Sequence, residues 1–132
     1  MRRAKEINAS LCQIFVKNNK QWFGKPFTPE DLAAYAGELA ASKLSCVFGH
    51  TGYLINLGGP DSENRDRSIK SLIQEIELAT ELELPFLVLH PGAHLGMGET
   101  AGLKQIVAGL DQVFAATKKS PVRVALENTA GQ

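Results

Sequence analysis

The sequence predicts an α/β protein built on a parallel sheet, because short apolar runs alternate along it with segments of helical periodicity. Its 132 residues fit one domain, and the 44% hydrophobic and 21% charged fractions exclude disordered and collagen-like chains. The 14 basic residues balance the 14 acidic ones, so no basic field covers the whole surface. A polyanion such as nucleic acid would therefore have to meet a local cluster of cations.

Four runs have the composition expected of strands buried on both faces of a parallel sheet. Each is short and largely apolar and lacks a clean alternation of apolar and polar residues. The runs are residues 11–16, 44–48, 85–89 and 122–126.

Helical segments separate these runs. Thr28 offers a hydroxyl N-cap and Pro29 the first helical position of a helix whose apolar face continues to Leu39. Apolar residues at i, i+3, i+4 and i+7 predict two more helices, over residues 69–79 and 103–114. Residues 1–9 predict a further short helix before the first strand.

The spacing of the strands narrows the architecture. The polar residues that follow the runs stand at positions 17, 50, 90 and 127, and these are 33, 40 and 37 residues apart. Such spacing is close to the ~30 or more residues of one unit in a (β/α)8 barrel, although a doubly wound sheet stays open. A barrel takes ~250 residues. We therefore expect residues 1–132 to be one partial barrel domain, roughly the first half, truncated at both ends and with open edge strands.

Nothing in the sequence predicts export or membrane insertion. No apolar run approaches the ~20 residues of a membrane span, and the residues after Met1 do not form a signal peptide, so we expect a cytoplasmic protein. Cys12 and Cys46 lie in apolar runs, and we expect both to be buried, reduced thiols.

A polar residue follows each predicted strand: Lys17, His50, His90 and Glu127. The carboxyl ends of parallel strands lie at one edge of a sheet, where functional side chains converge. Two imidazoles and a carboxylate can hold zinc and leave a position open for water or substrate. The alternative is that each is an ordinary hydrogen-bonded residue at the end of its strand.

The loops after the strands favour an anionic ligand. Residues 17–22 combine two lysines, amides and Trp22, which suits phosphate contact and stacking. The alternative is a solvated loop with Trp22 packed on the rim of the barrel. The loops at 50–58 and 90–96 are glycine-rich, so their backbone N–H groups can approach a phosphate. Tyr53 is either a packing residue or a nucleotide contact, and His94 is expected to support its surroundings.

Four segments together resemble the endonuclease IV family: residues 17–22, 50–58, 90–96 and 126–132. The resemblance covers essentially the whole chain, in order and spacing. It implies a TIM barrel that acts in base excision repair as a zinc-dependent apurinic/apyrimidinic endonuclease, cutting double-stranded DNA on the 5′ side of abasic sites with three metal ions.

The resemblance also implies roles for individual residues. His50, His90 and Glu127 match the ligands of one zinc, with Glu127 as a catalytic residue that bridges to a second. Lys20 stands where the family often has an arginine that inserts near the lesion, and lysine lacks the planar group that arginine offers. DNA contacts are expected of Lys17, Lys20, Trp22, Tyr53 and Asn56, and support of the ligands is expected of His94 and Asn128.

The remaining metal ligands of the family would lie beyond Gln132 and before Met1, so at most one zinc site is expected here, with weak or no activity. Two alternatives stay open. One is a metal-dependent sugar isomerase or epimerase, because related barrels hold a metal with His and Glu. The other is a non-catalytic half-barrel that associates through its open edges with itself or with a complementary half.

Overall fold

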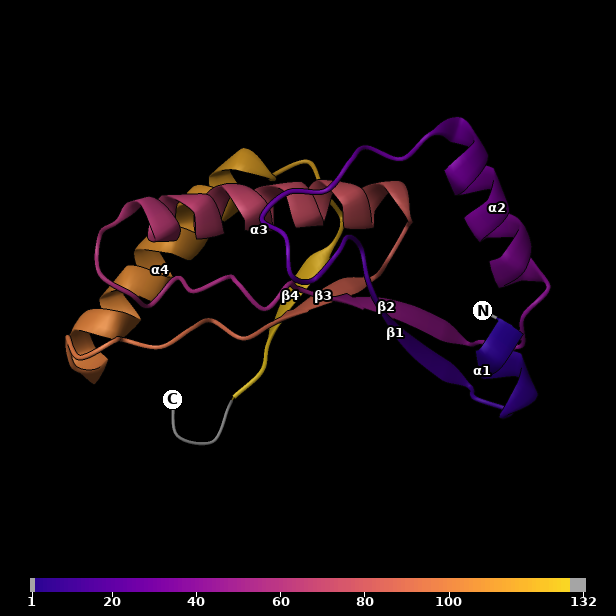
Figure 1. Cartoon of the computed structure of the whole chain (residues 1–132), viewed down its shortest axis with the longest axis horizontal. Coiled ribbons are helices and arrows are strands. Elements are labelled where there is room, and N and C mark those ends of the chain that lie inside the picture. Colours follow the sequence, from indigo (N-terminus) through magenta and orange to yellow (C-terminus); the bar gives the residue numbers. More distant parts are fainter. Residues whose placement is uncertain (1, 129–132) are drawn as a thin grey trace.

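The computed structural model describes residues 2–128, in which four parallel strands alternate with helices (Figure 1). The strands follow one another across the sheet in the order β1-β2-β3-β4. A doubly wound sheet reverses its strand order at a switch point, so the unbroken order confirms part of a (β/α)8 barrel. The elements are α1 Arg2–Glu6, β1 Leu11–Phe15, α2 Pro29–Ala40, β2 Cys46–His50, α3 Glu63–Glu81, β3 Phe86–Leu89, α4 Glu99–Ala116 and β4 Arg123–Leu126.

The helices start where side chains or glycine allow it. Thr28 caps α2 as predicted, because its hydroxyl accepts from the Asp31 N–H while the Asp31 carboxylate accepts from the Thr28 N–H. Helix α3 begins six residues before the predicted boundary, capped by Ser62. Its first turns are polar and carry no apolar repeat, so periodicity could not reveal them.

The core lies between the sheet and the helices on one of its faces (Figure 1). Leu87 and Leu89 of β3 are fully buried against Leu72 and Ile76 of α3 and Val113 of α4. A second cluster joins β2 and the residue after β1 to the end of α3, and Leu32, Tyr35 and Leu39 of α2 pack against it. Its buried members are Val16, Val47, Leu78, Ala79, Leu82 and Leu84. Because helices cover this face, the functional residues at the strand ends rest on a rigid base.

The prediction that every strand is buried on both faces is wrong for β1 and β4, the edge strands of the described sheet. Leu11 of β1 is 55% exposed and Leu126 of β4 is 56% exposed. Each of these strands pairs on one side only within residues 2–128. Cys12 of β1 is half-buried for the same reason, and Cys46 is half-buried because it precedes the part of β2 that pairs with β3. Neither is buried as predicted, although both thiols are free. Of the described helices, none combines the length and apolarity that crossing a membrane requires.

Candidate metal centre

Three strand ends bring His50, His90 and Glu127 together. His50 is the last residue of β2, while His90 and Glu127 directly follow β3 and β4. One ligand atom from each residue lies within 4.8 Å of the others. The Nε2 atoms of His50 and His90 are 3.3 and 3.4 Å from the same Glu127 oxygen, Oε2. Parallel pairing of the strands thus brings residues that are far apart in the sequence close together at one edge of the sheet.

Both imidazole rings are oriented by backbone carbonyls. His50 Nδ1 lies 2.8 Å from the Thr51 carbonyl oxygen, and His90 Nδ1 lies 3.3 Å from that of Glu127. A carbonyl oxygen can only accept, so these contacts favour the proton on Nδ1 when the ring is neutral. The lone pairs of both Nε2 atoms then face the Glu127 carboxylate.

This donor set fits zinc. Zinc–ligand bonds of ~2.0–2.1 Å in a tetrahedron correspond to ligand–ligand separations of about 3.4 Å. The two nitrogen–oxygen distances, 3.3 and 3.4 Å, match this value, and all three ligand atoms lie within 4.8 Å of one another. Two lone pairs that face one carboxylate oxygen repel it unless a cation or a further proton lies between them. The residues present are therefore suited to hold one divalent ion.

A cavity of 370 Å³ adjoins this group, lined by His50, His90, Tyr53, Asn56, Gly92 and Leu95 among others. His50 is buried at 7% exposure, whereas the Glu127 side chain is 49% exposed. The group is thus closed on its β2 side and open on its β4 side, which leaves room for a water molecule or a substrate.

Two loops flank the cavity and are joined through their backbones. The Tyr53 N–H donates to the Asn19 carbonyl at 3.0 Å. The Tyr53 ring packs edge-to-face on Phe15 and is 65% exposed, so most of it is free to meet a partner. Lys20 is exposed and Trp22 half-buried. The DNA contacts of Lys20, Trp22 and Tyr53 stay predictions.

Lys17 forms a buried ion pair with a carboxylate of α3. Its ammonium lies 2.9 Å from Glu75 Oε1 of α3, and the Lys17 side chain is only 3% exposed. It also donates to the Gln21 carbonyl at 2.6 Å. The end of β1 directs this side chain into the protein, where the ion pair with Glu75 compensates its charge. The DNA contact of Lys17 stays a prediction.

The Asn56 side chain connects two loops of the site through hydrogen bonds to backbone groups. Its amide nitrogen donates to the Ala93 carbonyl at 3.1 Å, and its oxygen accepts from the N–H groups of Ala93 and Gly58, both at 3.0 Å. Both ends of the amide are therefore occupied by backbone. Asn56 ties the loop after β2 to the loop after β3, and its contact with DNA stays a prediction.

His94 and Asn128 lie outside the ligand group. His94 Nδ1 accepts from the N–H groups of Gly96 and Gly98 at 3.2 and 3.1 Å, which shapes the turn before α4. This contact supports the loop. Asn128 is exposed directly after Glu127, and its supporting role stays a prediction.

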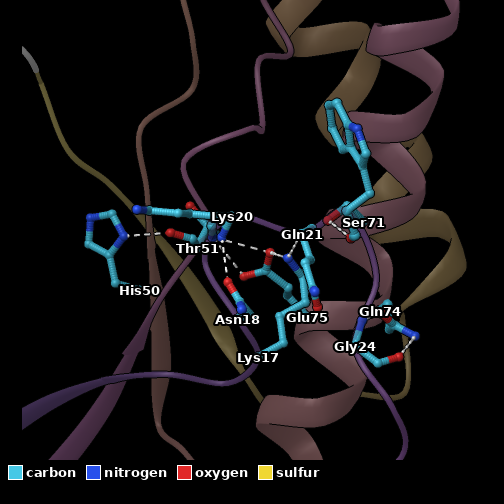
Figure 2. Close-up of polar contacts among 12 residues, drawn as sticks. Lys17, Asn18, Lys20, Gln21, Gly24, His50, Thr51, Ser71, Gln74 and Glu75 are labelled. Atoms are coloured by element: carbon cyan, nitrogen blue, oxygen red, sulfur yellow. Dashed lines mark hydrogen bonds and ion pairs between the residues drawn. The ribbon is translucent and has the colours of Figure 1, made fainter.

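The sequence reasoning missed the part of α3 that holds the first loop (Figure 2). Ser71 donates to the Trp22 carbonyl at 2.6 Å, and the Gln74 amide binds both backbone groups of Gly24. Glu75 is 1% exposed at its side chain, and burial raises the pKa of its carboxyl group while Lys17 opposes the rise. Helical periodicity could have indicated this contact, because Glu75 lies on the buried face of α3.

Comparisons with known proteins agree with the fold. Residues 1–132 match the family described as a xylose isomerase-like TIM barrel. The probable endonuclease 4 of Chloroflexus aggregans is 38% identical over 130 residues, which are 98% of this chain and 46% of that protein. That of Nitrosopumilus maritimus is 40% identical over 131 residues, again 98% and 46%. The chain spans about half the length of the curated relatives it matches.

Solved structures with the same fold superpose on this chain. The crystal structure of endonuclease IV from Thermus thermophilus superposes with a TM-score of 0.82 at 27% identity, covering 99% of this chain and 46% of that one. A D-tagatose 3-epimerase-like protein superposes with a TM-score of 0.76 at 17% identity, covering 100% and 49%. The second likeness is one of fold alone.

Proposed function

This chain belongs to the xylose isomerase-like TIM barrel family, and from that premise we propose that it forms the metal-binding part of a DNA repair endonuclease that cleaves at abasic sites. Its similarity to proteins named probable endonuclease 4 supports the proposal. The single observation that carries it is the group of His50, His90 and Glu127 at the strand ends.

In this proposal His50, His90 and Glu127 hold one zinc ion. A zinc ion there supplies a Lewis acid for hydrolysis of a phosphodiester. Glu127 is the proposed bridging and catalytic carboxylate, because both histidines face one of its oxygens and the side chain remains half-exposed. Lys20 offers a cation to a backbone phosphate, and Tyr53 and Trp22 offer rings to a sugar or base beside the lesion.

We further propose that this chain alone incises DNA weakly or not at all. The resemblance implies three metal ions, and His50, His90 and Glu127 form the single ligand group among residues 2–128. A hydrolysis that uses several ions loses its clamp on the attacking and leaving oxygens when only one is held. Binding of abasic duplex DNA is then a more direct test of the proposal than cleavage.

The experiment compares the wild-type chain with His90→Ala and His94→Ala. His94 is the matched control, since it is the third histidine of the chain and lies outside the ligand group. Calorimetric titration of the metal-free chain should show one zinc ion per chain, and His90→Ala should weaken zinc binding by at least about 100-fold, whereas His94→Ala should not. Equal losses in both variants would contradict the assigned centre.

DNA recognition is measured by fluorescence anisotropy at one fixed salt concentration, because phosphate contacts depend strongly on salt. A duplex with one abasic site should bind more tightly than the intact duplex, and Tyr53→Ala should reduce this preference. Equal affinity for both duplexes would overturn the proposed substrate. Turnover of a ketose without DNA binding would favour the sugar isomerase alternative, which rests on fold similarity alone.

A further inference from the structure

We propose that Glu75 is a positioning residue for His50, acting through the peptide group between Thr51 and Gly52. The inference rests on the proposed function only in taking His50 as a metal ligand. Glu75 lies on α3 and does not itself face the cavity beside the ligand group. Its effect on His50 is carried by the backbone between them.

The contacts form a continuous chain. His50 Nδ1 lies 2.8 Å from the carbonyl oxygen of Thr51. The N–H of Gly52 donates to Glu75, at 3.2 Å from Oε1 and 3.1 Å from Oε2. The Thr51 carbonyl and the Gly52 N–H belong to one planar, resonance-stabilised peptide unit. His50 and the Glu75 carboxylate therefore occupy the two ends of the same dipole, and Figure 2 shows them on the two sides of this loop.

The carboxylate strengthens the bond to the histidine. A negative group at the N–H end polarises the peptide and increases the negative charge on its carbonyl oxygen, as in other hydrogen-bond chains. The oxygen then accepts more strongly from His50 Nδ1–H, which fixes the tautomer and the ring orientation. Fixing Nδ1 in this way leaves Nε2 available to a metal, the role that groups behind a histidine ligand commonly have.

The position of Glu75 needs an explanation beyond the packing of α3. Ser71 and Gln74 already hold the loop of residues 17–24 to the helix with neutral groups. A buried ion pair is a weak source of stability, because desolvation offsets its attraction. Unlike Ser71 and Gln74, Glu75 reaches the loop after β2, at the Gly52 N–H.

The fit around Gly52 agrees with this assignment. A Cβ atom at Gly52 would lie 3.1 Å from the Lys17 ammonium and 3.3 Å from Glu75 Oε1, which is tighter than most real contacts. The backbone of Gly52 is thus pressed directly onto the ion pair. A side chain there would push the peptide group away from Glu75.

Three variants test the proposal. Lys17→Met/Glu75→Gln removes both charges and keeps an oxygen for the Gly52 N–H, whereas Lys17→Met/Glu75→Leu removes that oxygen as well. Changing both partners avoids leaving one charge buried alone. Ser71→Ala is the matched control: Ser71 is fully buried on the same helix and hydrogen-bonds the neighbouring loop but not the Thr51–Gly52 peptide. Circular dichroism confirms that each variant is folded.

The first measurement is ¹⁵N NMR of the His50 ring in the metal-free chain, at a pH where the ring is neutral. Wild-type and Ser71→Ala should show the proton on Nδ1, and the leucine variant should show a shift toward the other tautomer. The second is zinc affinity, expected to fall by about 10- to 100-fold in the leucine variant and less in the glutamine variant. Ser71→Ala should stay within about twofold of wild type.

Two results would overturn the proposal. One is that both pair variants retain the wild-type tautomer and zinc affinity. The other is an equal loss in Ser71→Ala, which would assign the effect to packing between the helix and its loops. If the wild-type chain binds no zinc, the proposed function fails, while the tautomer in the metal-free chain still decides the role of Glu75.

Discussion

Replacing Asn56 with alanine removes the side chain that ties two loops of the candidate site together. The amide makes three hydrogen bonds to backbone groups of Ala93 and Gly58. A hydrogen bond of this kind contributes about 1 kcal/mol net, and N–H groups left without a partner add to the loss. The structure therefore predicts that Asn56→Ala lowers the free energy of unfolding by about 3 kcal/mol.

Urea denaturation followed by circular dichroism measures this change, with Asn18→Ala as the control. The Asn18 side chain accepts one bond from the Lys20 N–H on an exposed loop. Surface changes of that kind stay within about 0.5 kcal/mol. A loss below about 1 kcal/mol for Asn56→Ala, together with weaker binding of abasic DNA, would refute the structural role and support the predicted DNA contact of Asn56.

Three further predictions follow from single residues. Gly92→Ala should lower the free energy of unfolding by about 2–4 kcal/mol and weaken zinc binding, because Gly92 has φ +112 and a Cβ there would overlap Asn56 Oδ1. Urea denaturation measures the first effect and calorimetry the second, and wild-type values in both would contradict the clash. Tyr35→Phe should raise the free energy of unfolding by about 1 kcal/mol, since the buried hydroxyl has no hydrogen-bond partner among residues 2–128; a loss in denaturation experiments would show that the hydroxyl is satisfied. Burial raises the pKa of Glu75 above its usual 4.5 against the opposing effect of Lys17, so the folded chain holds this proton more tightly than the unfolded chain and stability falls as pH rises from 4.5 through the raised pKa. The Lys17→Met/Glu75→Gln pair should remove this fall without leaving a charge buried alone. A difference in the free energy of unfolding between wild type and this variant that does not change with pH would disprove the linkage.

The order of the sheet and the convergence at the strand ends were predictable because each depends on local patterns. Apolar runs and helical repeats define the βα units, and parallel pairing then brings equivalent strand ends to one edge. His50, His90 and Glu127 follow from this rule alone. The Thr28 cap was predictable for a similar reason, since the residues that form it lie within one helical turn.

The roles of Lys17 and Asn56 depend on distant partners, which residue type does not reveal. A lysine after a strand can point to solvent or to a buried carboxylate. In the sequence, Glu75 is indistinguishable from the other charged residues of an amphipathic helix. The Asn56 amide hydrogen-bonds the backbone of Ala93, which is 37 residues away. Every residue type has these backbone groups, so the sequence does not reveal the contact. Half-burial of Cys12 likewise depends on which strands lie at the edge of the sheet.

The separation of the three ligands along the chain has a consequence for folding. Glu127 is 77 residues from His50 and 37 from His90. A bound ion would therefore act as a cross-link that closes long loops, and such links restrict the unfolded chain more as the loops lengthen. The ion can meet all three ligands only after β4 has joined β3. Metal capture would then come late in folding and would lock the last strand to the sheet.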